Sequence, residues 1–155
     1  MHDIGKLRVN RDGYSDERDD TLVVEQMKYV RMHSAYSRDI LRDENYPENI
    51  IEAVYHHHEN YDGSGYPDGL KGTDIPEMSR ILRTCDVFSA LITNRSYRKA
   101  FDKKTAMAIM IDEVEDYDME VFLAFQRVFH DDKFPEIRNL QDMASEIQME
   151  NLDRK

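Results

Sequence analysis

Residues 56–72 read HHHENYDGSGYPDGLKG and contain four of the chain's six glycines and one of its four prolines. Glycine and proline interrupt regular structure more often than other residues do, so this stretch predicts a long loop. Apolar residues on both sides of it recur at helical spacing, and no stretch of any length alternates apolar and polar residues as a strand would. The sequence therefore predicts an all-α fold whose main loop follows three consecutive histidines.

Prolines and aspartates mark where the predicted helices begin. Pro47 suits the first turn of a helix, a further helix follows Pro76, and Asp102 and Asp118 are suitable N-caps. We expect a helical domain over residues 1–130 and, beyond Pro135, an amphipathic helical tail over 131–155. The predicted helices of the domain cover about 16–41, 47–58, 76–92, 102–114 and 118–129.

The size and charge of the chain exclude several classes of protein. With 155 residues, of which 40% are hydrophobic, it is long enough for one packed core and too short for two. Its 32 acidic and 21 basic residues give a net charge of -11, which repels duplex nucleic acid. Its single cysteine cannot form an intramolecular disulfide, and no apolar stretch approaches the ~20 residues of a membrane span. We therefore expect a cytoplasmic protein without a membrane span or a duplex nucleic-acid partner.

Two of the three consecutive histidines are predicted to face the core. On a helix, His57 and His58 follow Val54 by three and four residues and flank the same inward stripe, whereas His56 points away. Such histidines are satisfied by core carbonyls, solvated at a frayed helix end, or used as ligands. Two adjacent inward histidines favour the ligand interpretation.

Asp86 places a carboxylate on an otherwise apolar helix face, four residues after Leu82. A buried carboxylate is costly unless it is paired or bound to a metal. Asp86 therefore either forms a salt bridge with Arg83 or another base, or serves as a ligand. His2 and Asp3 add an imidazole and a carboxylate from a different segment.

The candidate ligands form a mixed nitrogen and oxygen set of the kind that holds Mn, Fe, Ni or Zn. If they converge, they place two metals close together, which activates a water near neutral pH and clamps a phosphoryl group for in-line attack. The six candidates are His2, Asp3, His33, His57, His58 and Asp86.

Two further segments offer places for a ligand. Residues 62–72 are rich in glycine, which lets a ligand approach the backbone closely, but the segment does not match a Walker loop and also suits a plain connector. Residues 95–99 read RSYRK, a basic cluster whose arginines bind phosphate oxygens bidentately and whose Tyr97 can stack on a base or donate its hydroxyl. The other interpretation of this cluster is a solvated helix end.

In combination, these segments resemble the HD-GYP family, a branch of the HD superfamily of metal-dependent phosphohydrolases. The resemblance covers about residues 1–129. It implies an HD-domain-like helical bundle and a phosphodiesterase that hydrolyses cyclic di-GMP to linear pGpG or onward to GMP in bacterial signalling. The motifs that carry it are HDIGK at 2–6, HHE at 57–59, DGSGYP at 62–67, IP at 75–76, DVFSAL at 86–91 and RSYR at 95–98.

The resemblance also implies roles for single residues in catalysis and metal binding. Asp3 would bridge two divalent metals, Fe or Mn in the first place and otherwise Ni or Zn. Lys6 would lie beside the scissile phosphate, so that Asp3 and Lys6 are the implied catalytic residues. The remaining metal ligands would be His33, His57 and His58 for one site and His2 and Asp86 for the second.

Substrate and partner contacts are implied for two other segments. Arg95 and Arg98 would hold substrate phosphate, with Tyr97 between them as a further contact. The loop that names the family would take part in partner binding as well as in activity. Its residues here are Gly65, Tyr66 and Pro67.

The N-terminus departs from the family pattern. Family members carry an upstream helix whose histidine supplies the first metal ligand, and this chain begins after that helix. We therefore expect an N-terminally truncated member with one metal site incomplete. The alternative function is an impaired module that binds a cyclic dinucleotide, or a diguanylate cyclase domain of the GGDEF type, without turnover. We also hypothesise a homodimer in which the tail near Leu140 and Ile147 covers the apolar face that the missing helices leave exposed.

Overall fold

The computed structural model describes residues 2–6, 20–95 and 98–130, and the side chains of the first described helix from Arg31 onward. Within these ranges the chain forms α-helices and two short 3-10 helices but no named strand, which confirms the all-α prediction. The predicted tail over 131–155 lies outside the described residues. The elements are α2 (Asp20–Asp43), α3 (Glu48–Tyr55), η1 (Gly72–Asp74), α4 (Glu77–Leu91), α5 (Lys103–Asp112), η2 (Val114–Asp116) and α6 (Met119–His130).

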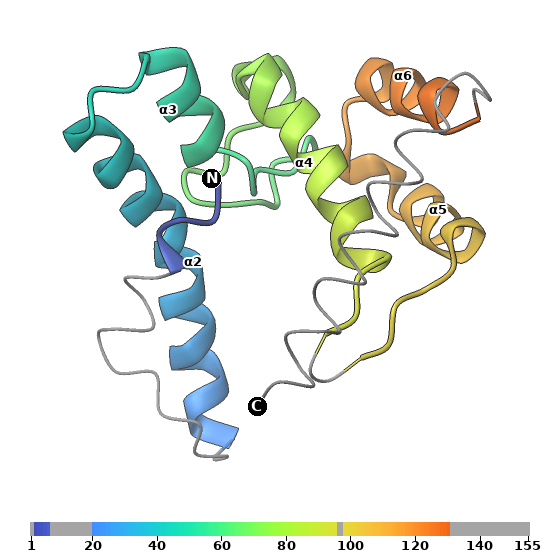
Figure 1. Cartoon of the computed structure of the whole chain (residues 1–155), viewed down its shortest axis with the longest axis horizontal. Helices are drawn as coiled ribbons and strands as arrows, with labels where there is room; N and C mark the ends of the chain where they lie inside the picture. The colour runs from blue at the N-terminus through green and yellow to red at the C-terminus, as the bar shows by residue number, and fades with distance from the viewer. Residues whose placement is uncertain (1, 7–19, 96–97, 131–155) are drawn as a thin grey trace, which may run out of the picture.

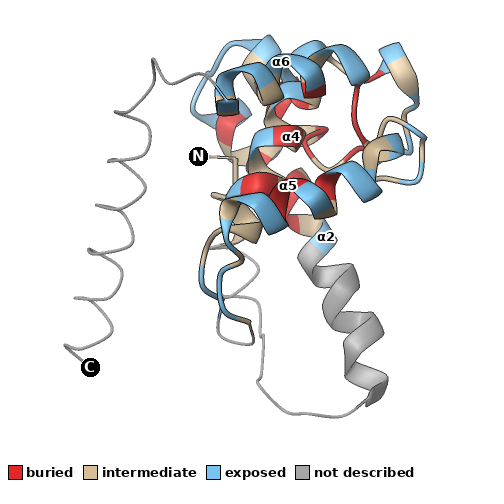
Figure 2. Ribbon diagram, turned by 90° about the vertical axis from the view of Figure 1, so that its right-hand side faces the viewer, coloured by how far each residue is buried: buried red, intermediate tan, exposed pale blue. Residues whose placement is uncertain are grey.

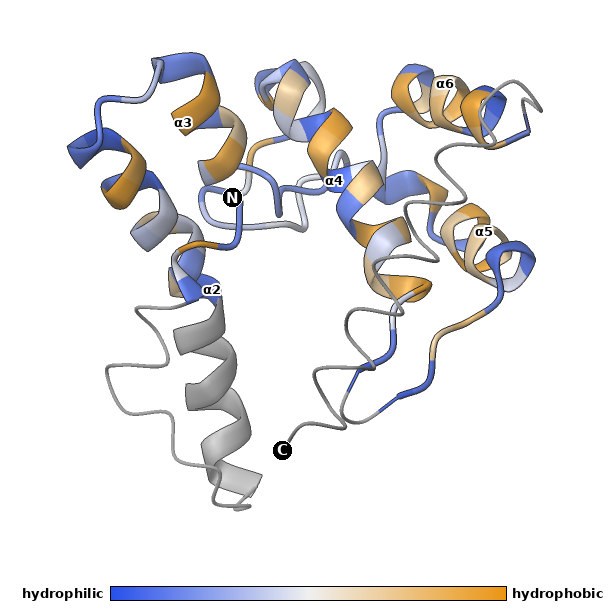
Figure 3. Ribbon diagram, viewed as in Figure 1, coloured by the Kyte–Doolittle hydropathy of each residue, from blue (hydrophilic) through white to orange (hydrophobic). Residues whose placement is uncertain are grey.

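The helices follow one another across the molecule, with α4 in the middle (Figure 1). α2 packs on α3, α3 packs on α4, and α4 packs on both α5 and α6. Figure 2 shows buried residues where α4, α5 and α6 meet, and Figure 3 shows hydrophobic residues along these same helices. No described helix combines the length and the apolar character that crossing a membrane requires.

Two apolar clusters hold these helices together. The larger one joins α4, α5 and α6, and Phe88, Met110 and Phe122 lie within it. The smaller one joins α2 to α3 through a leucine, an isoleucine and a valine, each at most 5% exposed. Burying one large apolar side chain stabilises a fold by about 1.5–3 kcal/mol. The contact between α3 and α4 links the two clusters.

Helix α3 is shorter than the sequence predicts. It ends at Tyr55, and the N–H of Glu59 donates to the His56 carbonyl oxygen, 3.0 Å away, so that residues 56–58 form a turn. The prediction that the second and third histidines of this run lie on a helix face is therefore wrong. A turn carries them instead, with His57 buried and His58 half-buried, and His56, which the sequence predicts to point away, is itself buried.

The later helices begin close to where the sequence predicts. α4 follows Pro76, α5 follows Asp102, and α6 follows Asp118. Each of the two aspartates accepts hydrogen bonds from two backbone N–H groups of the helix that it precedes. These bonds satisfy amide donors that the first turn of a helix leaves without a partner.

Residues 2–6 lie against α2 and bring candidate ligands to it. The N–H of Gly5 donates to Ser37 Oγ at 2.9 Å, and the Ser37 hydroxyl donates to the His2 carbonyl oxygen at 3.0 Å. A Cβ atom on Gly5 would lie 2.1 Å from the His33 carbonyl oxygen. Only glycine therefore allows the N-terminal segment to approach α2 this closely.

Candidate metal centre

Imidazoles and carboxylates from four segments converge on one cluster. The segments are residues 2–6, α2, the turn after α3, and α4. Their side chains form two groups, and within each group the potential ligand atoms all lie within 4.8 Å of one another. The structure thus brings together all six ligands that the sequence suggests. One group is Asp3, His33, His57 and His58, and the other is His2, His57 and Asp86.

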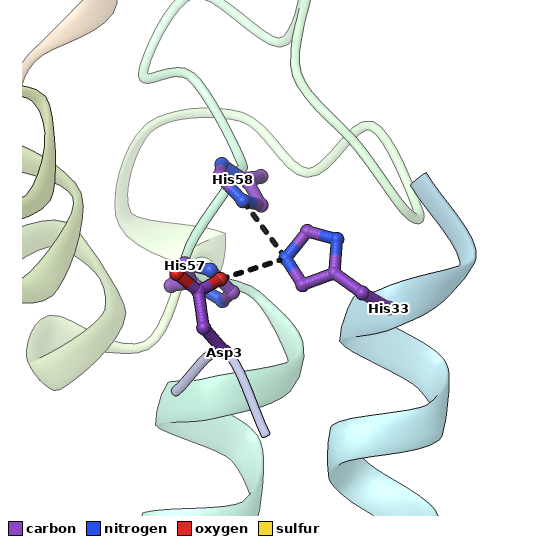
Figure 4. Close-up of side chains that lie close together, drawn as sticks. All are labelled: Asp3, His33, His57 and His58. Atoms are coloured by element: carbon purple, nitrogen blue, oxygen red, sulfur yellow. Dashed lines mark hydrogen bonds and ion pairs between the residues drawn. The ribbon is translucent and has the colours of Figure 1, made fainter. Parts of the chain in front are cut away.

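His33 contacts two other members of the first group. Its Nε2 atom lies 3.4 Å from Asp3 Oδ1 and 3.1 Å from His58 Nε2 (Figure 4). Two imidazole nitrogens at this distance either share one proton or both present lone pairs to a metal ion. His33 is fully buried, and Figure 4 shows the side chains of the group converging from different segments of the chain.

His57 belongs to both groups and has a nitrogen without a partner. Its Nδ1–H donates to the Val54 carbonyl oxygen, 2.6 Å away, which fixes the tautomer and leaves a lone pair on Nε2. Nε2 is buried and has no hydrogen-bond partner among the described residues. Buried polar atoms are nearly always paired. Among carboxylates and imidazoles, a lone pair of this kind can be donated to a metal ion. The residues present therefore fit a divalent metal.

Asp3 connects the two groups. Its Oδ1 lies toward His33, while its Oδ2 lies 3.5 Å from His2 Nε2. His2 Nε2 is also 3.2 Å from Asp86 Oδ1. Among the described residues the ion pairs of Asp86 are with His2 and not with Arg83, the base that the sequence offers as an alternative. A carboxylate with its two oxygens directed to two ligand groups has the arrangement of a bridging ligand.

Burial keeps two imidazoles of the cluster neutral. It lowers the pKa of His57 to about 4 and the pKa of His58 to about 2, because the charged form is poorly solvated there. Neutral imidazole is the form that binds a metal. His2 differs, because hydrogen bonds to Asp3 and Asp86 raise its pKa to about 9. A metal in the second group has to displace the proton of His2.

Both carboxylates of the cluster are held in the ionised form. Burial opposes the ionisation of Asp3, but hydrogen bonds from His2 and Lys6 outweigh it and hold the pKa of Asp3 well below its usual range. Burial also opposes the ionisation of Asp86, and the hydrogen bond from His2 outweighs it and lowers the pKa. Lys6 Nζ lies 2.7 Å from Asp3 Oδ1 and its side chain is 44% exposed, which places a cation at the rim of the cluster.

The glycine-rich loop folds back onto the turn that carries the histidines. A Cβ atom on Gly65 would lie 2.2 Å from the Asn60 nitrogen and 2.5 Å from the His58 carbonyl oxygen. The N–H of Tyr66 donates to that same carbonyl oxygen at 3.1 Å, and the Tyr66 ring stacks on the His58 imidazole with 4.8 Å between centroids. The guanidinium of Arg31 lies 5.1 Å from the centroid of the Tyr66 ring. The loop is therefore part of the wall of the cluster.

The two arginines of the basic cluster have different surroundings. Arg98 donates to the carbonyl oxygens of Ala90, at 2.9 Å, and Leu91, at 3.2 Å, and so caps the C-terminus of α4. Arg95 is exposed. Tyr97 lies outside the described residues, so its predicted role is not addressed by the structure. Phosphate binding by Arg95 and Arg98 stays a prediction.

The sequence predicted no individual role for two residues of this region. Glu59 is buried and hydrogen-bonded to the far end of the loop, and Arg31 contacts the Tyr66 ring. A charged residue directly after paired histidines was the available signal for Glu59. Arg31 has no such signal, because its contact joins α2 to a loop that is distant in the sequence.

Comparisons with known proteins yield relatives of one kind. A family model described as HD domain matches residues 1–121. The chain is 35% identical over 136 residues to the 3'3'-cGAMP-specific phosphodiesterase 3 of Vibrio cholerae. It is 31% identical over 131 residues to the cyclic di-GMP phosphodiesterase PA4108 of Pseudomonas aeruginosa. These matches cover 84% and 81% of this chain but only 28% and 30% of the two relatives, so the chain spans less than a third of their length.

A solved structure shares the arrangement of the helices. It is a cyclic GMP-AMP-specific phosphodiesterase of Vibrio cholerae, which superimposes with a TM-score of 0.56 at 20% sequence identity. The match covers 81% of this chain and 33% of that one. At this level of identity the likeness concerns the fold, and it places the described helices within a known helical architecture.

Proposed function

The chain belongs to the HD domain family, with the motifs of its HD-GYP branch, and we propose that it is a metal-dependent phosphodiesterase that hydrolyses cyclic di-GMP. The observation that carries this proposal is the pair of adjoining ligand groups that share His57. In the reaction, water adds across one phosphodiester: the bond from phosphorus to a ribose 3' oxygen breaks, and the water oxygen joins phosphorus. The product is linear pGpG, and a second hydrolysis yields GMP.

The ligand groups define two metal sites in this proposal. Asp3 would bridge them, and Fe or Mn is the expected metal, with Ni or Zn as alternatives for a mixed imidazole and carboxylate set. When bound, the metals supply polarisation of the phosphoryl oxygens and activation of the attacking water. The other ligands are His33, His57 and His58 at the first site and His2 and Asp86 at the second.

Lys6 is the proposed catalytic cation from the chain itself. Its ammonium group is held by Asp3 and partly exposed, so it lies where a phosphate that approaches the cluster would meet it. There it would offset negative charge that builds up on the phosphoryl oxygens. Asp3 stays ionised throughout, because its low pKa keeps a proton off the carboxylate.

Arg95 is the better placed of the two arginines to bind substrate phosphate. It is exposed, whereas Arg98 would have to exchange hydrogen bonds with backbone carbonyl oxygens for a bond to phosphate. Tyr97 and the loop residues 65–67 are the further proposed contacts. The loop lies directly beside His58, so a substrate bound at the metals would meet it.

Turnover by purified protein tests the proposal. The full chain is loaded with Mn²⁺ or Fe²⁺ and incubated with cyclic di-GMP and, separately, with 3'3'-cGAMP, because the relatives' names include both nucleotides. Chromatography should show a linear product from cyclic di-GMP, no product with Asp3→Asn, and unchanged turnover with His130→Gln on the exposed end of α6. Turnover of 3'3'-cGAMP alone would correct the substrate, and no turnover of either would refute the activity.

The second ligand group favours one alternative function. It has three members and shares His57 with the first group, so it would hold its metal more weakly. A chain with one metal would bind a cyclic dinucleotide, or a GGDEF-type diguanylate cyclase domain, without turnover. Metal analysis separates the two functions, because one metal per chain with binding and no product supports the alternative, and two metals with turnover exclude it.

We also propose that the protein acts in the cytoplasm and forms a homodimer. The cytoplasm is where an enzyme of a bacterial second messenger would act. On α6 the side chains of Met119, Leu123 and Val128 are each more than 40% exposed, and apolar exposure of this kind is often covered by a partner. Light scattering should give the mass of a dimer, and a monodisperse monomer would contradict this part of the proposal.

A further inference from the structure

Glu59 carries a fully buried carboxylate directly after the candidate ligand His58. A buried carboxylate is costly unless hydrogen bonds compensate it. Both oxygens of Glu59 accept hydrogen bonds from successive backbone N–H groups at the far end of the glycine-rich loop. Oε1 accepts from Asp68 at 2.7 Å and Gly69 at 3.1 Å, and Oε2 accepts from Leu70 at 3.1 Å.

These hydrogen bonds join the end of the loop to the residue at its start. Glu59 stands where the loop starts and holds residues 68–70 where it ends, so segment 60–67 is fastened at both ends. Within that segment the Tyr66 ring stacks on the His58 imidazole, with 25° between the ring planes. Tyr66 thus lies in a segment that is held by its own N–H bond to the His58 carbonyl oxygen and, beyond Pro67, by the hydrogen bonds of Glu59.

His58 lacks the direct support that His57 has. The imidazole of His57 donates to a backbone carbonyl oxygen, which fixes its orientation. Among the described residues, the imidazole of His58 has one hydrogen bond, to His33, and otherwise contacts aromatic rings. Residues behind a metal ligand commonly fix its orientation, and their loss costs about 10- to 100-fold in metal affinity or activity.

We propose that Glu59 is a positioning residue of the metal centre, because it holds the loop so that Tyr66 keeps the His58 imidazole in its ligand orientation. This inference rests on the proposed metal centre and concerns how one ligand is oriented. Glu59 is not a member of either ligand group, and its oxygens are already engaged by backbone N–H groups. Its effect on the metal is therefore exerted through His58.

Glu59→Gln is the variant that tests the proposal with least change of shape. The amide oxygen can still accept hydrogen bonds, but its NH₂ group meets a backbone N–H, so at least one of the three bonds is lost. Glu52→Gln is the matched control, because it is the same substitution seven residues earlier, on α3. The Glu52 carboxylate lies 3.2 Å from His56 Nε2 and, among the described residues, forms no hydrogen bond or ion pair with the loop.

The first measurement uses the metal-free full chain. Amide hydrogen exchange reports residues 68–70, and the NMR shifts of the His58 ring protons report the ring current of Tyr66. With Glu59→Gln we expect about tenfold faster exchange at 68–70 and a clear change of the His58 ring shifts. With Glu52→Gln we expect neither.

The second measurement uses Co²⁺ as the probe, followed by visible absorption during a titration. We expect Glu59→Gln to weaken Co²⁺ binding about tenfold. Tyr66→Leu should weaken it similarly without faster exchange at residues 68–70. The double variant should show little further loss, because both substitutions act through the orientation of His58.

Several outcomes would overturn the proposal. Faster exchange at 68–70 with unchanged His58 shifts and unchanged Co²⁺ affinity would make Glu59 a loop anchor only. Additive losses in the double variant would show that Glu59 does not act through Tyr66. If Glu59→Gln does not fold, unchanged His58 shifts in Tyr66→Leu would refute the positioning route. None of these readouts requires turnover, so a metal-binding chain that fails to hydrolyse a nucleotide would refute the proposed function and leave this inference standing.

Discussion

His57 is the residue on which both ligand groups depend. Nδ1 of His57 is held by the Val54 carbonyl oxygen, so Nε2 is its one available ligand atom and binds one metal at a time. Replacement of His57 by alanine removes that ligand, so we expect at least one of the two metals to be lost on dialysis against metal-free buffer. Elemental analysis of the dialysed protein measures this directly. His130→Ala, at the exposed end of α6, is the control and should keep the wild-type metal content. Retention of the full wild-type metal content by His57→Ala would show that the shared nitrogen is not a ligand.

The kinds of residue in the site could be predicted from the sequence better than their contacts. Adjacent histidines and a carboxylate on an apolar face are visible in the sequence, and the structure brings both kinds together. The helix-face argument for His57 and His58 was wrong, because a turn carries them. The contacts of Arg98 could not be foreseen: its hydrogen bonds go to backbone carbonyl oxygens, while its phosphate contact stays a prediction. Because every residue has a backbone carbonyl oxygen, the sequence does not indicate which ones will accept such bonds.

At the scale of elements, α6 is fastened to α4 through Asp118. One oxygen of Asp118 accepts from the N–H of Glu120 at 2.8 Å, and the other forms an ion pair with Arg80 of α4. Asp118→Ala removes both interactions, at about 1 kcal/mol for the cap and about 1–3 kcal/mol for the charge that loses its partner. Asp118→Asn keeps a capping oxygen and should lose less. Urea unfolding of the two variants measures the difference, and equal losses would mean that the ion pair contributes nothing.

The same ion pair predicts a pH dependence of stability. Burial opposes the ionisation of Asp118, but the hydrogen bond from Arg80 outweighs it, so the pKa in the folded state lies below the unfolded value. The contribution is therefore complete above the unfolded pKa, about 4, and is lost as pH falls through the folded pKa. The stability difference between wild type and Asp118→Asn should shrink from pH 6 to pH 3. Urea unfolding at both values checks it, and a constant difference would contradict the assigned shift.

The two arginines that follow α4 are expected to differ in their effect on stability, because Arg98 is hydrogen-bonded to the end of the helix and Arg95 is exposed. Arg98→Ala removes the caps on the last carbonyl oxygens of α4, so we expect a loss of about 1–3 kcal/mol in the free energy of unfolding. Arg95→Ala should change stability by no more than about 0.5 kcal/mol but weaken cyclic dinucleotide binding, because its side chain is exposed and cationic. Urea unfolding and calorimetric binding measure the two effects. A loss of stability in Arg95→Ala together with weaker binding in Arg98→Ala would contradict these roles.

Helix beginnings could be predicted more reliably than the end of α3. Pro76, Asp102 and Asp118 act within one helical turn of their own position, so local sequence is sufficient to locate the starts. The end of α3 is different, since residues 56–58 contain no residue that breaks a helix. The chain turns there while Glu59 engages the end of a loop, and that tertiary contact has no local signature.

At the scale of the whole molecule, the candidate metal centre joins the N-terminal segment, α2, the turn after α3, and α4. A metal that binds the folded chain and not the unfolded one stabilises it by about 2.7 kcal/mol at a concentration of 100 times Kd. The melting temperature should therefore be higher with Mn²⁺ than with a chelator. We expect the segment 2–6 to be essential to this effect, because it supplies the candidate ligands His2 and Asp3.

Gly5→Ala tests whether that segment must lie on α2 for the metal to bind. The added Cβ would lie 2.1 Å from the His33 carbonyl oxygen, which is backbone and cannot move aside without disturbing α2. We expect the segment to be displaced and the Mn²⁺-induced rise in melting temperature to disappear. The melting temperature with chelator should change less, because the apolar clusters do not include this segment. Gly72→Ala is the control: an added Cβ meets nothing within 4 Å, and although its φ of +60° disfavours alanine and lowers the melting temperature with chelator, the Mn²⁺-induced rise should remain. A full Mn²⁺ response in Gly5→Ala would show that the N-terminal ligands are dispensable, and the bridging role of Asp3 would then be wrong.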